Sequence, residues 1–138
     1  MSSAYESATL LIRLYELRRE PTMRDARGWY ARDFNPSSVD EIMQAMGGPH
    51  SGHFRMVTSY WDMAASFVLN EAIDEKMFND ANGEQLVVFA KLEPFITDYR
   101  AKMGNPAYLG SLEKLVMKRD RAKEQMASIR ERFRAMAR

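Results

Sequence analysis

The stretch from residue 53 to residue 72 constrains the fold of this chain more than any other. Its apolar side chains recur every three or four positions, so a helix through the stretch presents one broad apolar face. The opposite face is polar but nearly uncharged at its centre, which is typical of a helix that packs on several sides. We therefore predict that this is the central helix of an all-α bundle. The apolar face consists of Phe54, Val57, Tyr60, Trp61, Ala64, Phe67, Val68 and Ala72.

The composition suits one globular domain. A chain of 138 residues with 46% hydrophobic and 28% charged residues can bury a core without a metal or a disulfide. It contains no cysteine, which excludes disulfides and cysteine nucleophiles and agrees with a reducing compartment. The apolar segment 8–17 is interrupted by Arg13 and Glu16 and is shorter than the roughly 20 residues that a membrane span needs. We expect a cytoplasmic protein with no transmembrane segment.

Helical periodicity and turn signals divide the rest of the chain into further helices. Pro94 lies inside one of them and predicts a kink or break near Lys91, because proline cannot donate the backbone hydrogen bond of a helix. No strand pattern is longer than residues 86–89, and no repeat is present. The prediction is a single helical domain, residues 1–138, built as a bundle of five or six helices. The further helices are expected over about 4–19, 22–34, 38–46, 73–79, 84–103 and 107–138, with Thr22 capping the helix over 22–34 and Ser38 capping the one over 38–46.

The C-terminal segment, about residues 107–138, combines a heptad pattern of apolar residues with a basic excess. From Met117 onward it has eight Lys or Arg against three Asp or Glu. As one long helix it would extend about 48 Å, more than the roughly 37 Å diameter of a globule of this size. Its apolar seam would then lie in solvent unless another chain covered it, whereas a bent or frayed helix would remove the need for a partner. We predict a homodimer that self-associates through Leu115, Ala122, Met126, Ile129, Phe133 and Met136.

Several short motifs connect this chain to a known family. They are Tyr60-Trp61-Asp62, Ala72-Ile73-Asp74-Glu75, Pro94-Phe95-Ile96, Tyr99-Arg100 and Gly104-Asn105-Pro106, preceded by residues 15–18 and 23–27. Over about residues 12–116 the chain resembles an uncharacterised family of small bacterial helical proteins catalogued as a domain of unknown function. Many of those relatives carry an N-terminal membrane segment, which is not expected here. The resemblance implies a helical architecture and a bacterial origin, and it implies no activity, cofactor or site residue.

Asp62 and Arg100 are charged residues with apolar neighbours along the chain. If their helices pack together, the carboxylate and the guanidinium can form a charge-assisted ion pair. We therefore predict a structural ion pair between Asp62 and Arg100. Two alternatives stay open: a polar pocket in which Arg100 binds an anionic ligand, and exposure of both side chains on the surface.

His50 and His53 are the only histidines and offer two imidazoles for a metal. Two ligands are too few for a structural site, and Asp62 and Glu71 lie too far along the same helix to complete it. The sequence contains no nucleophile elbow, no P-loop and no dinucleotide-binding glycine pattern. We assign no catalytic, cofactor-binding or metal-binding residue, although carboxylates alone can carry acid–base catalysis.

Three functions agree with these patterns. The favoured one is a non-catalytic protein that acts through contacts with itself or with another protein. The first alternative is a protein that binds nucleic acid or an anionic surface through its basic C-terminal helix. The second is an enzyme or small-ligand binder with a polar site near Asp62 and Arg100. The basic residues of the C-terminal helix are Lys118, Arg119, Arg121, Lys123, Arg130, Arg132, Arg134 and Arg138.

Overall fold

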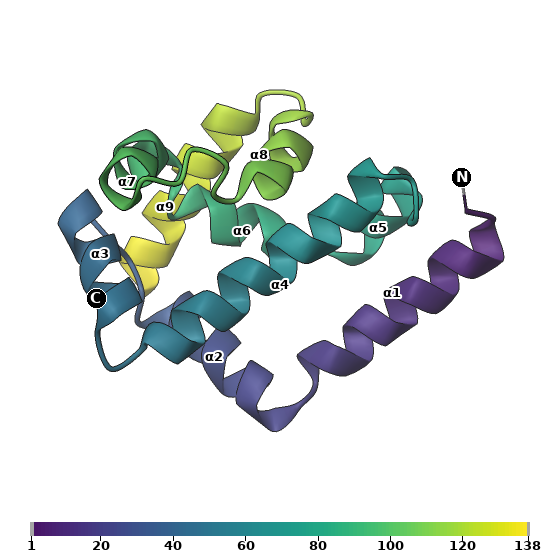
Figure 1. The fold of residues 1–138 in the computed structure, drawn as a ribbon, viewed down its shortest axis with the longest axis horizontal. Coiled ribbons are helices and arrows are strands. Elements are labelled where there is room, and N and C mark those ends of the chain that lie inside the picture. Colours follow the sequence, from purple (N-terminus) through teal and green to yellow (C-terminus); the bar gives the residue numbers. More distant parts are fainter. Residues whose placement is uncertain (1, 138) are drawn as a thin grey trace.

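A computed structural model of the chain describes residues 2–137, and every regular element in this range is helical (Figure 1). The predicted all-α class is confirmed. The helices outnumber the predicted five or six, in part because the segments 84–103 and 107–138, each predicted as one helix, are both divided. The elements are α1 (Ala4–Arg18), α2 (Pro21–Arg32), α3 (Val39–Gly47), α4 (Ser51–Leu69), α5 (Glu75–Ala81), α6 (Glu84–Ala90), the 3-10 turn η1 (Glu93–Phe95), α7 (Ile96–Met103), α8 (Gly110–Met117) and α9 (Ala122–Ala137).

Helix α4 is the central helix that its apolar pattern predicts. It runs through the middle of the molecule and packs against α2, α3, α5, α6 and α8 (Figure 1). The side chains of Phe54, Val57 and Trp61 are completely buried. Because burial of one such side chain contributes about 1.5–3 kcal/mol, this helix supplies a large part of the hydrophobic stabilisation.

The start of α2 differs slightly from the prediction. Thr22 was expected to cap this helix, but the helix begins earlier, with Pro21 as its first residue. The carboxylate of Glu20 accepts a hydrogen bond from the backbone N–H of Met23 at 3.0 Å. Proline is favoured at the first position because its missing N–H has no partner there in any helix. Ser38, in contrast, caps α3 as predicted.

The break that Pro94 predicts is present. Helix α6 ends at Ala90, the 3-10 turn follows, and α7 begins at Ile96. Lys91 lies at this break and is only 2% exposed. The broken helix therefore places a lysine inside the molecule, where its ammonium group needs hydrogen-bond acceptors.

The ammonium group of Lys91 finds these acceptors at the end of α2. Its Nζ donates to the carbonyl oxygens of Tyr30, Ala31 and Phe34 at 2.7, 3.1 and 2.8 Å. The last carbonyls of a helix have no partner within the helix and carry partial negative charge. Lys91 therefore caps the C-terminus of α2 from a different helix and ties α2 to α6.

The predicted single helix over residues 107–138 is wrong. Helix α8 ends at Met117 and α9 begins at Ala122, and between them Arg121 has a φ of 54°. This left-handed conformation costs a residue other than glycine roughly 1–2 kcal/mol. The turn lets both helices lie on the bundle, where several side chains become buried. Burial of one large apolar side chain contributes about 1.5–3 kcal/mol, so the free energy gained by burial exceeds the cost of the turn. The buried side chains are Leu112, Leu115, Val116, Ala122, Met126 and Ile129.

The residues predicted to form a self-association seam lie mostly inside the chain's own core. Four of them, Leu115, Ala122, Met126 and Ile129, are at most 6% exposed. The ring of Phe133 is partly buried, and its centroid lies 4.6 Å from the Nζ of Lys91. Met136 is the exposed exception, at 72%. Most of these positions therefore cover the chain's own bundle, and of the six only Met136 is largely exposed.

Candidate functional site

Asp62 and Arg100 bind other partners in the structure, so the predicted ion pair between them is wrong. The Oδ1 of Asp62 accepts a hydrogen bond from the backbone N–H of Leu112 at 2.9 Å. Arg100 lies 2.9 Å from the carboxylate of Glu113 and donates from Nε to the carbonyl oxygen of Tyr108 at 2.9 Å. The first turn of α8 and the segment that leads into it thus supply partners for both side chains. Both charges therefore help to hold α8 on the bundle.

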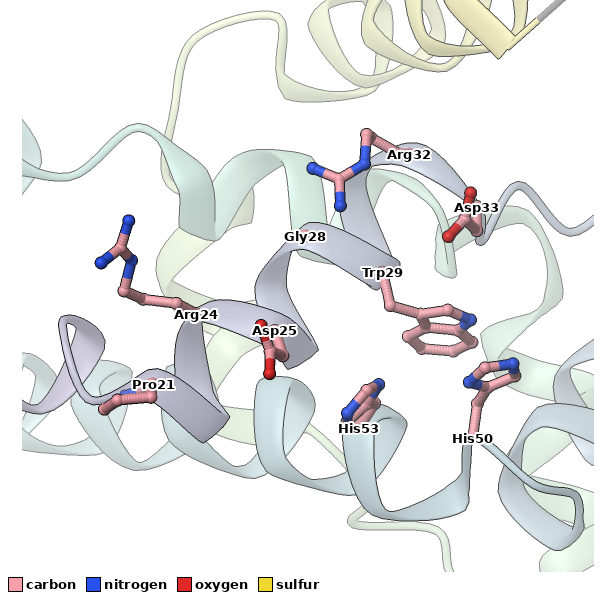
Figure 2. A pocket seen from close by; sticks show the side chains of 9 residues that line it. All are labelled: Pro21, Arg24, Asp25, Gly28, Trp29, Arg32, Asp33, His50 and His53. Atoms are coloured by element: carbon pink, nitrogen blue, oxygen red, sulfur yellow. The ribbon is translucent and has the colours of Figure 1, made fainter.

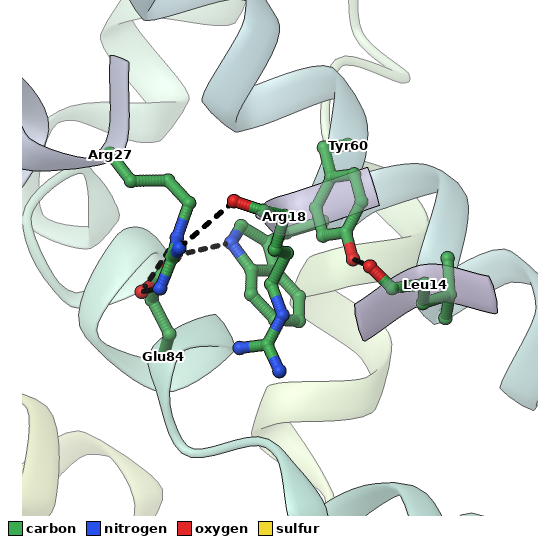
Figure 3. A network of polar contacts seen from close by, with 6 residues as sticks. Leu14, Arg18, Arg27, Tyr60 and Glu84 are labelled. Carbon is green, nitrogen blue, oxygen red and sulfur yellow. Dashed lines mark hydrogen bonds and ion pairs between the residues drawn. The ribbon is translucent and has the colours of Figure 1, made fainter. Parts of the chain in front are cut away.

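A second polar cluster joins α1, α2, α4 and α6 (Figure 3). Arg27 donates to the carboxylate of Glu84 from Nε at 2.9 Å and from Nη2 at 2.8 Å. The indole N–H of Trp61 donates to the same carboxylate at 3.0 Å, and Arg27 also donates to the carbonyl oxygen of Arg18 at 3.3 Å. The hydrogen bond to Glu84 raises the pKa of Arg27. Because each charge has a partner inside the chain, this cluster serves the fold.

The Arg27–Glu84 pair is expected to couple strongly in a double-mutant cycle. Arg27→Met and Glu84→Gln should each lower the free energy of unfolding by about 1–3 kcal/mol, because each leaves a partly buried group without its charged partner. The double variant should cost at least about 1 kcal/mol less than the sum. Urea unfolding measures all four proteins. The surface pair Lys76–Asp80, whose side chains are 85% and 63% exposed, is the control and should couple by less than about 0.5 kcal/mol. Additive effects at Arg27 and Glu84 would contradict the prediction.

Both histidines lie in a cleft of about 560 Å³ between α2 and the start of α4 (Figure 2). The indole ring of Trp29 is stacked with the ring of His50, with 5.1 Å between the ring centroids. The centroid of His53 lies 6.0 Å from that of His50. The cleft is lined by Pro21, Arg24, Asp25, Gly28, Trp29, Arg32, Asp33, His50 and His53.

The cleft offers little for a bound metal or a reaction. Within residues 2–137 no three His, Asp or Glu side chains come together in an arrangement that could hold a metal ion. The lining contains two arginines and two aspartates, whose opposite charges offset one another. His50 contributes its ring to aromatic packing on Trp29. The cleft therefore supports no catalytic or metal-binding assignment.

Helix α1 has one face on the bundle and an apolar face in solvent. Ser7 and Leu14 are buried, and the hydroxyl of Tyr60 donates to the carbonyl oxygen of Leu14 at 2.6 Å. On the other side of the helix, Tyr5, Ile12 and Tyr15 are 81%, 59% and 52% exposed. Figure 1 shows α1 at the edge of the molecule. We call the row formed by Tyr5, Ala8, Ile12 and Tyr15 the outer face of α1.

This outer face is unusual within the described part of the chain. Outside α1, the large hydrophobic side chains exposed among residues 2–137 are all methionines, namely Met63, Met103, Met117 and Met136. On α1 itself Leu17, which lies beside the row, is also 48% exposed. Tyrosine and isoleucine exposed in a row on one helix are typical of a contact surface. The sequence does not reveal this surface, because apolar residues occur on nearly every side of α1. The side that packs on the bundle contains a polar residue, Ser7, so its composition does not identify it as the buried side.

Four of the eight basic residues of the C-terminal segment pair with a glutamate or a backbone carbonyl within the chain. Arginine side chains of α9 donate to backbone carbonyls of the loop after α2 and of α6, and other basic side chains pair with glutamates. These contacts reduce the charge that would be free to bind phosphates. Arg138 lies outside the described residues. The pairs are Lys118 with Glu75, Arg121 with Glu124, Arg130 with the carbonyl of Ala90, and Arg134 with the carbonyl of Pro36.

Together the fold and these clusters define an all-helical bundle protein whose buried polar groups serve its architecture. Among residues 2–137, no helix has the length and the apolar character that crossing a membrane requires. The chain belongs to the family described as "Domain of unknown function (DUF4760)", which it matches over residues 3–119. This match confirms the family resemblance drawn from the motifs. Neither the curated proteins nor the solved structures contain a match to the chain.

Proposed function

We propose that this chain is a non-catalytic, cytoplasmic protein that acts through protein contacts, made by the outer face of α1. The observation that carries the proposal is the exposure of Tyr5, Ile12 and Tyr15 in one row. Each apolar square ångström removed from water contributes about 25 cal/mol, so this row can supply binding energy. Tyrosine is also enriched at protein interfaces, where its ring is buried and its hydroxyl finds a partner.

The charged clusters are paired within the chain, which favours a function in protein contacts over an enzymatic function. Glu84, Lys91 and Arg100 are the charged groups that an enzyme or an anion-binding site would be expected to use, and each is bound by groups of the same chain. Nucleic-acid binding through α9 is less well supported for the same reason, since Arg130 and Arg134 donate to backbone carbonyls. The absence of cysteine agrees with the cytoplasmic location.

Site-specific photo-crosslinking in cells that produce the protein tests this function. A photoreactive amino acid at Ile12 should give covalent protein adducts, because the outer face of α1 is then in contact with a partner. The same group at Met136, which is 72% exposed on α9, is the matched control and should give none. Adducts are detected by the increase in mass over the 16.0 kDa chain. Failure to obtain any adduct from Ile12 would reject contact through α1.

A further inference from the structure

We infer that the partner of the outer face of α1 is a second copy of this chain, with the two α1 helices packed antiparallel. The inference rests on the proposed function and adds the identity and the orientation of the partner. The row Tyr5, Ala8, Ile12, Tyr15 has spacings of three, four and three residues. This is the spacing with which one helix packs its side chains between those of another helix.

The sizes of the side chains favour self-pairing in the antiparallel direction. When one copy is reversed, Ile12 of each copy lies over Ala8 of the other, so a large side chain meets a small one at two symmetric positions. Tyr5 then lies opposite Tyr15. A parallel pair would instead set Ala8 opposite Ala8 and leave space unfilled at that layer, which costs packing energy. The row on one copy therefore fits the same row on a second copy that runs in the opposite direction, as a two-fold symmetric interface requires.

The charges of α1 favour the same direction. Its first turn contains Glu6, its last turn contains Arg18, and Arg19 follows at the next position of the heptad row. The guanidinium of Arg19 already lies over the ring of Tyr15, 5.7 Å from the centroid. A parallel pair would bring the two Arg19 side chains together and align the helix dipoles unfavourably. An antiparallel pair keeps the two Arg19 side chains at opposite ends of the contact and opposes the two helix dipoles.

The length of α1 limits the strength of the association. A helix of 15 residues is about 22 Å long, and one such pair of helices covers an area at the low end for protein interfaces. We expect a reversible dimer with a dissociation constant on the order of 10–100 µM. Measurements at low micromolar concentration would therefore detect mainly monomer.

Sedimentation equilibrium on the full chain, from about 5 µM to about 500 µM, tests the partner. The unmodified protein should shift from monomer to dimer across this range. Ile12→Glu should weaken the dimer at least about tenfold, because it places two charges at the centre of the contact. Met136→Glu, also at an exposed position, should leave the dissociation constant unchanged. Thermal melts check that both variants fold, which is expected since Ile12 is 59% exposed.

Engineered cysteines test the orientation, and the chain has no cysteine of its own to interfere. Ala8→Cys and Ile12→Cys proteins, one of them carrying a mass tag, are mixed under mild oxidation. The antiparallel pair predicts that the mixed 8-to-12 disulfide forms in excess over the two like disulfides. An excess of 8-to-8 and 12-to-12 disulfides would overturn the antiparallel arrangement.

The outcomes separate this inference from the proposed function. A protein that stays monomeric at about 500 µM, or a dimer that is insensitive to Ile12→Glu, overturns the second copy as partner. If Ile12 then crosslinks to a protein of different mass, contact through α1 still stands. A monomer that also gives no adduct at Ile12 rejects both. A dimer lost in Ile12→Glu, kept in Met136→Glu and trapped by the 8-to-12 disulfide supports both.

Discussion

A chain that ends at Val116 is expected not to fold. The deletion removes α9, whose Ala122, Met126 and Ile129 are buried against the bundle. Met126 and Ile129 each contribute up to about 3 kcal/mol and Ala122 contributes about 0.8 kcal/mol, and removal of α9 exposes the surfaces of α2, α6 and α8 that it covers. The loss is comparable to the whole stability of a domain this size, about 5–15 kcal/mol. We expect reduced helical circular dichroism and no cooperative transition in urea.

A chain from which fewer residues are removed provides the control. A chain that ends at Arg134 keeps Ile129, Phe133 and the hydrogen bond from Arg134 to the carbonyl oxygen of Pro36. It should unfold cooperatively, at a urea midpoint close to that of the full chain. The family match ends at residue 119, so the experiment asks whether the matched region can fold without α9. A cooperative transition in the chain ending at Val116 would show that α9 is dispensable.

Lys91→Met should lower the free energy of unfolding by about 3 kcal/mol. The substitution keeps the length of the side chain but leaves the carbonyl oxygens of Tyr30, Ala31 and Phe34 without their donor. Each unsatisfied buried polar group costs about 1–3 kcal/mol. The variant no longer buries a charged ammonium group, and this offsets part of the cost of the three unsatisfied carbonyls. Urea unfolding measures the difference. Lys123→Met, at an exposed position of α9, is the matched control and should be neutral within about 0.5 kcal/mol. A neutral Lys91→Met would show that the cap on α2 contributes nothing.

The pH dependence of the same variant provides a second readout. Burial lowers the pKa of Lys91 from 10.5 to about 8, although Asp33 acts in the opposite direction. Between these two values the unfolded chain binds more protons at this group than the folded chain. The free energy of unfolding should therefore rise between pH 8 and 10, by at most about 1.4 kcal/mol per pH unit. The rise is moderated because a neutral amine has two hydrogens for three carbonyls.

Lys91→Met should abolish this rise. Above pH 10 the buried tyrosines act in the other direction, because burial raises the pKa of Tyr30 and raises that of Tyr60 to about 12. The folded chain then keeps protons that the unfolded chain loses, and stability falls as pH increases. Comparison of the two proteins from pH 7 to 10 isolates the contribution of Lys91. An equal rise in both would assign it to other groups.

Local signals in the sequence predicted much of the fold. The period of apolar residues identified α4, Ser38 identified the start of α3, and Pro94 identified the break between α6 and α7. Each of these features depends on residues within one or two turns of each other, so they can be read from neighbouring positions. The family motifs likewise lie within the matched region.

The features that the sequence did not predict depend on distant contacts. The turn around Arg121 contains no glycine or proline, and its left-handed backbone follows from the burial of α8 and α9 on the same core. Asp62 binds the first turn of α8 and Arg100 binds the segment before it, and neither partner can be identified without knowing where α8 lies. The capping role of Lys91 joins positions about 60 residues apart. The outer face of α1 was missed because both sides of the helix are apolar.

The contact of α9 with α6 has a consequence for synthesis of the protein. Arg130 reaches the carbonyl oxygen of Ala90 across 40 positions of sequence. At about 5–20 residues per second, a ribosome needs several seconds to extend the chain from one to the other. Helix α6 therefore leaves the ribosome several seconds before α9, and during this interval it lacks the contacts that α9 makes with it in the finished protein. The nascent chain should therefore be a substrate for chaperones that hold exposed apolar segments until translation has delivered the last helix.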